Sequence, residues 1–159
     1  MFNMKKYFSI LSILLVFAAC NSSKTVVTAP PPPEPTGVQF VKSETLMSVL
    51  ESAKKDNKLV FVDFYTTWCL PCKLMDEEVF SDKEFGNFMN DNFISYKVDA
   101  EKGNGANLAL IYQVMVFPTL VFLDGDGKVL IRKDGTAFKT ELKKLATQAQ
   151  AAYQEASGE

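Results

Sequence analysis

Hydrophobic and polar positions follow a regular pattern from residue 38 onward in this 159-residue chain. Short apolar runs rich in Val, Ile and Phe alternate with segments in which apolar residues recur every three or four positions. The first pattern is typical of buried strands and the second of amphipathic helices. The runs predict strands at residues 38–41, 58–65, 93–99, 119–123 and 128–133. The three-to-four spacing predicts helices at residues 43–56, 70–79, 81–89, 107–112 and 138–154.

Three local signals support the boundaries of these elements. Ser43 is a candidate N-cap for the first helix, and the sequence SDKE at residues 81–84 has the form of a capping box. The sequence DGDG at residues 124–127 is typical of a tight turn between antiparallel strands. Helices between the earlier strands imply parallel crossovers. The order βαβαβαββα therefore predicts an α/β fold with a mixed central sheet flanked by helices.

The first 19 residues are organised like an export signal. Lys5 and Lys6 precede an apolar run at residues 7–19, which is shorter than the roughly 20 residues that a membrane-spanning helix needs. Two alanines come directly before Cys20, and the whole stretch resembles a bacterial lipoprotein signal. The resemblance implies that residues 1–19 are a removed signal peptide and that Cys20 is lipidated. Ordinary secretion is the alternative.

Residues 20–37 have a different composition from the rest of the chain. They are rich in Ser, Thr, Ala and Pro and end in APPPPEPTG, a composition that cannot bury a core and favours extended polyproline II. We interpret them as a flexible, Pro-rich tether. Residues 38–159 then form the folded domain, since the chain is 47% hydrophobic, with 13 Phe for a core.

Composition excludes several classes of function. The chain has no His, so catalysis by Ser–His or Cys–His pairs and His-based zinc sites are excluded. It has 17 basic and 19 acidic residues and no long basic run, which argues against a nucleic-acid partner. It also lacks a nicotinamide or flavin motif, and we expect no cofactor.

Two of the three cysteines, Cys69 and Cys72, follow a predicted strand directly and open a predicted helix. A permanent clip would stabilise the fold little, because the closed loop is so short. A zinc site would be half filled with only two thiolates, and we expect no metal. A reversible disulfide fits best, because a helix N-terminus stabilises a thiolate at Cys69 and tolerates Pro71 in its first turn.

One carboxyl group interrupts the apolar run at residues 58–65. Burial of Asp63 in that strand should raise its pKa, and the group could then exchange a proton with Cys72. A carboxylate satisfied by backbone hydrogen bonds is the alternative.

The sequence VDFYTTWCLPCK, together with VFPT at residues 116–119, resembles the thioredoxin superfamily. The stretch FYTTWCLPCKLMDEEVFSD is also similar to the C-terminal redox domain of bacterial transmembrane thiol:disulfide interchange proteins. The resemblance covers residues 38–152 and implies the thioredoxin fold. It implies that Cys69 attacks a partner disulfide and Cys72 resolves the product. It further implies a covering aromatic at Trp68, a cis-proline at Pro118 and a buried carboxylate at Asp63.

The same resemblance marks residues that would contact the partner protein. These are Leu70 and Pro71, between the cysteines, and Phe117, before the cis-proline, together with Trp68 and Pro118. Leu70 replaces the Gly of classical thioredoxins. Ser95 stands where the family often has a Lys near the buried Asp, and Lys97 lies two residues on along the same strand face.

The function expected from these features is thiol–disulfide exchange, with the protein acting as a reductase on disulfide-bearing exported proteins. A membrane thiol:disulfide interchange protein is the expected electron donor. The expected location is the bacterial cell envelope, on the periplasmic side and anchored by lipid. An oxidase or isomerase, and a non-catalytic binding module, are the alternatives.

Overall fold

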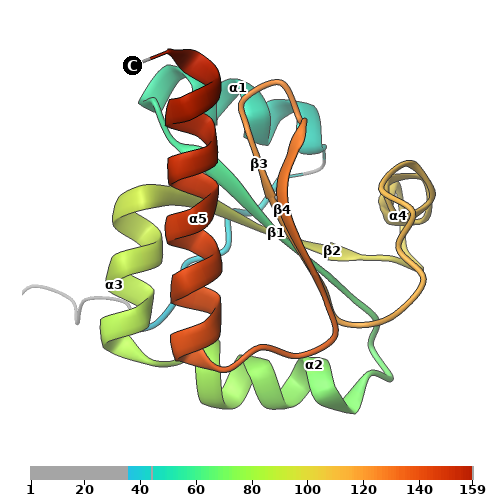
Figure 1. Cartoon of the computed structure of the whole chain (residues 1–159). Helices are drawn as coiled ribbons and strands as arrows, with labels where there is room; N and C mark the ends of the chain where they lie inside the picture. Colours follow the sequence, from blue (N-terminus) through green and yellow to red (C-terminus); the bar gives the residue numbers. More distant parts are fainter. Residues whose placement is uncertain (1–35, 44, 159) are drawn as a thin grey trace, which may run out of the picture. The chain divides into compact units, whose positions relative to one another are not determined.

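The computed structural model describes residues 36–43 and 45–158. The predicted signal peptide at residues 1–19, the candidate lipidation site Cys20 and nearly all of the predicted tether at residues 20–37 lie outside the described residues. The predicted domain is described almost completely and is built around one sheet (Figure 1).

The sheet has four strands in the order β2–β1–β3–β4. They are β1 (Leu59–Tyr65), β2 (Phe93–Asp99), β3 (Thr119–Leu123) and β4 (Val129–Asp134). β1 runs parallel to β2 and antiparallel to β3, and β3 pairs antiparallel with β4. The mixed sheet confirms the predicted fold class, and β1 occupies one of its two central positions.

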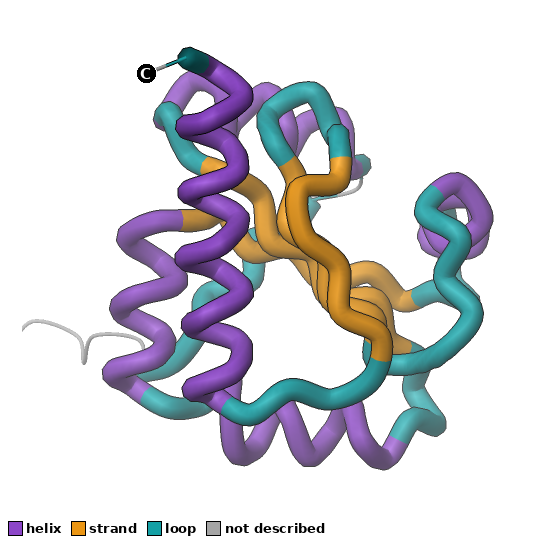
Figure 2. Tube along the Cα trace, viewed as in Figure 1, coloured by secondary structure: helices purple, strands orange, loops and turns teal. Residues whose placement is uncertain are grey.

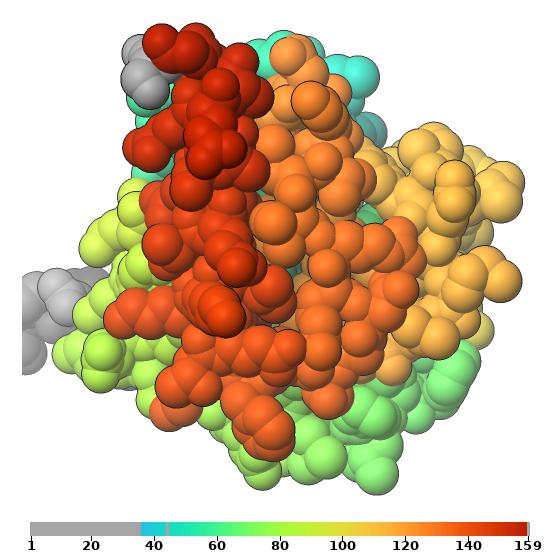
Figure 3. Space-filling view, in the orientation of Figure 1, coloured from blue at the N-terminus to red at the C-terminus, as the bar shows by residue number. Residues whose placement is uncertain are grey.

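Helices cover both faces of the sheet (Figure 2). α1 (Leu46–Asp56) and α4 (Gly105–Ile111) pack on one face. The other face is covered by α2 (Leu70–Met75), a π-helical turn η1 (Asp76–Phe80), α3 (Lys83–Asn92) and α5 (Lys139–Ser157). Figure 3 shows α5 lying directly against the hairpin of β3 and β4. Among the described residues, no helix is long and apolar enough to cross a membrane.

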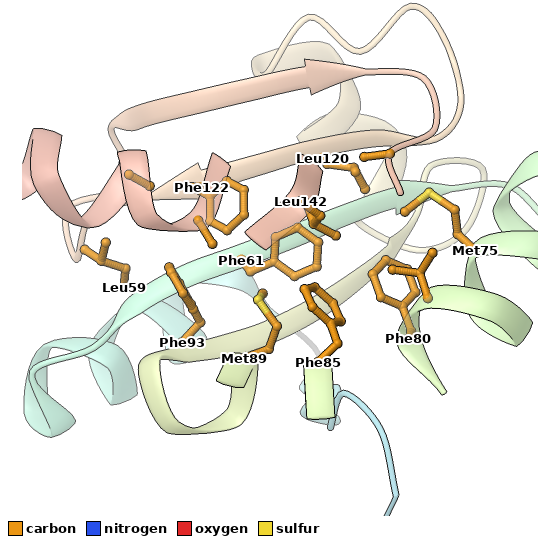
Figure 4. Close-up of a cluster of buried hydrophobic side chains, with 14 residues drawn as sticks. Leu59, Phe61, Met75, Phe80, Phe85, Met89, Phe93, Leu120, Phe122 and Leu142 are labelled. Atoms are coloured by element: carbon orange, nitrogen blue, oxygen red, sulfur yellow. The ribbon is translucent and has the colours of Figure 1, made fainter. Parts of the chain in front are cut away.

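β1 is buried on both faces and divides the core into two clusters. Phe61 lies at the centre of the cluster beneath α2, α3 and α5, with its ring 5.0 Å from that of Phe122 (Figure 4). The alternate residues Val60, Val62 and Phe64 face α1 and α4. Since residues two apart in a strand point to the same side, Asp63 shares the face of Phe61, beneath α2.

The predicted strand at residues 38–41 forms only one bridge, between Phe40 and Ser95 of β2. Its other backbone groups bond elsewhere: Val38 donates to the carbonyl of Phe80, and Gln39 donates to a side chain of α3. The segment therefore cannot extend the ladder, and this part of the sequence-based prediction was wrong.

The predicted capping residues of two helices were also wrong. Thr45 caps α1, whereas the hydroxyl of Ser43 donates to the carbonyl of Thr45. Asp82 rather than Ser81 caps α3 by accepting a backbone hydrogen bond of 2.9 Å from the first turn. Ser, Thr and Asp can all cap a helix, so neighbouring candidates are separated only by where the backbone turns.

Candidate active site

Cys69 and Cys72 form a disulfide with an S–S distance of 2.03 Å in the loop between β1 and α2. Cys69 is the N-cap of α2, and its Sγ accepts a hydrogen bond of 3.1 Å from the backbone N–H of Cys72. Pro71 lies in the first turn, where a helix has no partner for a backbone N–H. The sulfur of Cys69 thus lies at the end of a helix that can stabilise its thiolate.

Both cysteines are buried. Their exposed fractions are 3% for Cys69 and 2% for Cys72. Exposed apolar side chains lie next to them in the sequence, with Trp68 65% and Leu70 64% exposed. The disulfide is therefore set into a surface that can bind apolar parts of a partner.

The peptide bond between Phe117 and Pro118 is cis, as the sequence indicated. The hydroxyl of Thr119 donates to the carbonyl of Val116 over 2.8 Å, which closes this turn from inside. The ring of Phe117 meets that of Trp68 edge-on, with 6.0 Å between centres. This contact brings the proline loop to the cysteine loop.

Asp63 is only 1% exposed, and within the described part of the chain neither of its carboxylate oxygens has a hydrogen-bond partner. The nearest opposite charge is Lys97, whose Nζ lies 3.3 Å from Oδ2 of Asp63. Burial raises the pKa of Asp63 to about 6, and the charge of Lys97 opposes this rise. The helix α2 covers this face of the sheet with Cys72 and Met75 turned inward, so Asp63 and Cys72 share one interface.

Lys97 lies directly opposite Asp63 in the parallel register of β1 and β2. Ser95, at the position where sequence comparison suggested a family Lys, pairs instead with Phe61, and its buried hydroxyl has no partner. Lys97 therefore provides the cation beside the buried carboxylate.

Lys97 was already noted in the sequence, on the strand face of Ser95. Two residues that complete the site were not among the sequence-based candidates: Asp76, which binds Lys97, and Glu101, which binds the indole of Trp68. Their partners depend on how elements distant in the sequence pack together. Among the described residues, no three His, Cys, Asp or Glu side chains are grouped to hold a metal.

The assembled site has the parts needed for reversible disulfide exchange. It holds two sulfurs that can bond or separate, a helix end that stabilises a thiolate, and a buried carboxyl group that can take up a proton near neutral pH.

Comparison with known proteins agrees with this chemistry. Residues 46–150 match the family model described as a thioredoxin-like domain. A thioredoxin of Mycoplasmoides gallisepticum is 35% identical over 108 residues, which cover 66% of this chain and 98% of that protein. The disulfide bond reductase DsbH of Chlamydia pneumoniae is 29% identical over 108 residues, 62% of this chain and 65% of the relative.

A larger relative and a solved structure extend the comparison. The thiol:disulfide interchange protein DsbD of Salmonella typhi is 26% identical over 131 residues, 78% of this chain but only 23% of DsbD. The solution structure of a proposed disulphide-isomerase of Bacteroides thetaiotaomicron superposes with a TM-score of 0.62 at 32% identity. That likeness covers 76% of this chain and 97% of the other.

Proposed function

Because the chain belongs to the thioredoxin-like family and is a thiol–disulfide oxidoreductase, we propose that it works as a reductase of disulfides in other proteins. The observation that carries this proposal is the Cys69–Cys72 disulfide at the N-terminus of α2, next to the loop of Pro118. The name of the DsbH relative supports the reducing direction.

The reaction starts from the reduced pair. The thiolate of Cys69 attacks one sulfur of the partner's disulfide, and the other partner sulfur leaves as a thiolate. Cys72 then loses its proton, and its thiolate attacks the Cys69 sulfur. The partner leaves with two thiols, and two electrons have passed from the Cys69–Cys72 pair, which is now a disulfide. A dithiol donor must reduce it again.

We assign substrate contacts to the surface around the disulfide. The exposed Trp68, Leu70 and Pro71 lie on the cysteine side; the partly exposed Phe117 and the buried Pro118 lie on the proline side. The apolar character of these residues suits an extended segment with apolar side chains beside its Cys. Asp63 serves as the base that takes the proton of Cys72.

Trapping of the mixed disulfide tests the proposed reaction. The full chain, with Cys20→Ala to remove the third thiol, is reduced, freed of dithiothreitol and then mixed with insulin; insulin reduction is followed separately, with dithiothreitol as donor and its own background rate subtracted. The Cys72→Ser variant should accumulate a covalent adduct with insulin, because nothing resolves it. The Cys69→Ser variant should form no adduct and have no activity. Insulin reduction that survives Cys69→Ser would refute the enzymatic proposal.

The reduction potential of the pair tests the direction. A value near that of thioredoxin, about −270 mV, supports a reductase, whereas about −120 mV would mark an oxidant. The likeness to a proposed disulphide-isomerase makes isomerisation the second candidate. A value near −180 mV, roughly that of disulfide isomerases, with refolding of scrambled ribonuclease would favour it.

We further propose that the domain works in the bacterial cell envelope, facing the periplasm. In this proposal residues 1–19 are removed, Cys20 carries the lipid and residues 20–37 tether the domain of residues 38–159 to the membrane. Disulfide-bearing exported proteins are the substrates, and a membrane thiol:disulfide interchange protein is the donor. The likeness to DsbD supports a place in such an exchange chain. Cys20→Ala should release the protein from the membrane fraction; unchanged membrane retention would contradict lipidation.

A further inference from the structure

One ammonium group is shared by two carboxylates beneath the cysteine helix. Lys97 of β2 lies 3.3 Å from the buried Asp63 of β1 and also contacts Asp76, the first residue of η1. The two acids differ sharply in burial: the side chain of Asp63 is 1% exposed, and that of Asp76 is 46% exposed. The buried acid thus depends on a cation that a solvated acid also binds.

Aromatic rings hold this ammonium in place. The Nζ of Lys97 lies 4.9 Å from the ring centre of Tyr65, 5.1 Å from that of Phe40 and 5.5 Å from that of Phe80. These rings and the two carboxylates come from β1, η1 and the segment at residues 36–43. Ring faces attract a cation, and the Lys97 side chain is only 19% exposed. The ammonium is therefore held among fixed partners and is largely shielded from solvent.

We propose that Asp76 is a positioning residue for disulfide exchange, which competes with Asp63 for Lys97 and so controls when Asp63 can accept the proton of Cys72. This inference rests on the proposed function. The acid acts through Lys97, because a cation drawn toward Asp76 stabilises the Asp63 carboxylate less.

The competition matters at one step of the reaction. The Cys72 thiol passes its proton to the Asp63 carboxylate, the resulting thiolate attacks the Cys69 sulfur, the Cys69 bond to the partner breaks and the partner leaves as a thiolate. The base must be charged before this step and protonated after it. If Lys97 stabilised the Asp63 carboxylate too strongly, Asp63 would be a weak base. The pKa of Asp63 is instead raised, and the charge of Asp76 contributes to this rise, so Asp63 is a stronger base than an ordinary carboxylate.

The test measures Asp63 itself and the turnover of the full chain. In Asp76→Asn, Lys97 pairs with Asp63 alone, and the pKa of Asp63, followed by carbon-13 NMR of its carboxyl group, should fall by about one unit. The acid limb of the pH–rate profile for insulin reduction should move down by the same amount. Asp76→Glu should restore the original values. Glu78→Gln, which removes an exposed charge from the same turn, is the matched control and should change neither.

Measuring the effect of Asp76→Asn in a Lys97→Met chain shows whether Asp76 acts on Asp63 through Lys97 or by direct charge repulsion. In Lys97→Met the pKa of Asp63 should rise, and adding Asp76→Asn should then have a smaller effect than in the wild-type background. An Asp63 titration unmoved by Asp76→Asn, or an equal shift in both backgrounds, would overturn the inference while leaving the reductase proposal intact. A shifted titration in a chain that reduces no disulfide would instead refute the proposed function.

Discussion

The indole Nε1 of Trp68 lies 3.0 Å from each of the two carboxylate oxygens of Glu101. This hydrogen bond joins the cysteine loop to the end of β2 and acts on a side chain that is 65% exposed. With the edge contact to Phe117, it fixes the orientation of the largest apolar surface at the site. In the proposed substrate contact, the Trp68 side chain is already held in place and would lose less conformational entropy when a partner protein binds.

Removal of this hydrogen bond should weaken substrate binding more than turnover. Glu101→Ala frees the indole, and loss of one such bond, about 1 kcal/mol, corresponds to roughly a fivefold rise in KM for insulin. The value of kcat should change little, and Trp68 fluorescence anisotropy should fall. Glu155→Ala, an exposed acid on α5, is the control. A fall in kcat with an unchanged KM would contradict this role.

The buried carboxyl group of Asp63 should make stability depend on pH. Its pKa is about 6 in the folded chain against an ordinary value of 3.8, so the folded state favours the protonated form. Between these values the folded state binds more protons, and the free energy of unfolding falls as pH rises. Above pH 6 the buried charge costs about 3 kcal/mol.

Asp63→Asn removes this charge. The variant should therefore be more stable than wild type by up to about 3 kcal/mol at pH 8, and lose nearly all of this gain at pH 3.5, where the folded state is protonated and the unfolded state mostly so. Urea unfolding at the two pH values measures the difference. Asp91→Asn, an exposed acid on α3, should give no pH-dependent gain. An equal effect of Asp63→Asn at both pH values would show that the carboxyl group is not titrating as described.

Arg132 of β4 fixes the start of the loop that leads to Pro118. Its guanidinium donates to the carbonyls of Tyr112 and Gln113, the latter over 3.0 Å, and to Asp134 over 2.8 Å. A Lys cannot reproduce this set of planar donors. Arg132→Lys should lower the free energy of unfolding by about 1–2 kcal/mol and raise KM.

The reciprocal exchange on the same strand provides the control for Arg132. Lys133→Arg keeps an ion pair with Glu141 and should stay within about 0.5 kcal/mol of wild type. If Arg132→Lys behaves like Lys133→Arg in urea unfolding, the guanidinium contacts do not stabilise the loop.

Gly86 of α3 packs directly against the backbone of Gly37. A Cβ at this position would lie 2.2 Å from the carbonyl carbon of Gly37, a backbone atom that cannot move without displacing its segment. Gly86→Ala should cost about 1–3 kcal/mol and speed amide hydrogen exchange at Val38 and Val41. Gly125→Ala is the control, because its Cβ would meet only the flexible side chain of Lys54. If amide hydrogen exchange at Val38 and Val41 were as slow in Gly86→Ala as in wild type, the close contact between Gly86 and Gly37 would be contradicted.

The sequence predicted β2 and β3 with their observed bounds, because each is a short run rich in apolar, β-branched and aromatic residues, which is typical of a strand whatever its neighbours. The segment at residues 38–41 has a similar run but was mispredicted as a strand. Its N–H groups bond to η1 and α3 as well as to β2. A short run does not reveal how many of its backbone groups have partners on a neighbouring strand.

Some residues of the candidate site could be placed from the sequence, and others could not. Cys69, Cys72 and Pro71 follow one another along the chain, so local sequence could place them. The sequence also indicated the strand face of Lys97, but its pairing with Asp63 depends on the parallel register of β1 and β2. Glu101 approaches Trp68 only in the folded chain, so its role could not be recognised from the sequence.

The attachment of residues 37–41 also has a mechanical consequence. Val38 is bonded to Phe80, the carbonyl of Gly37 accepts from Asn90, and Val41 is bonded to Ser95, so one short segment is fastened to three separate elements. Tension applied from the N-terminal side would be divided among η1, α3 and β2 before it reached β1. The three attachment points, Phe80, Asn90 and Ser95, all lie outside the loop that carries Cys69 and Cys72, so a pull on the N-terminal end reaches the two sulfurs only through the folded domain.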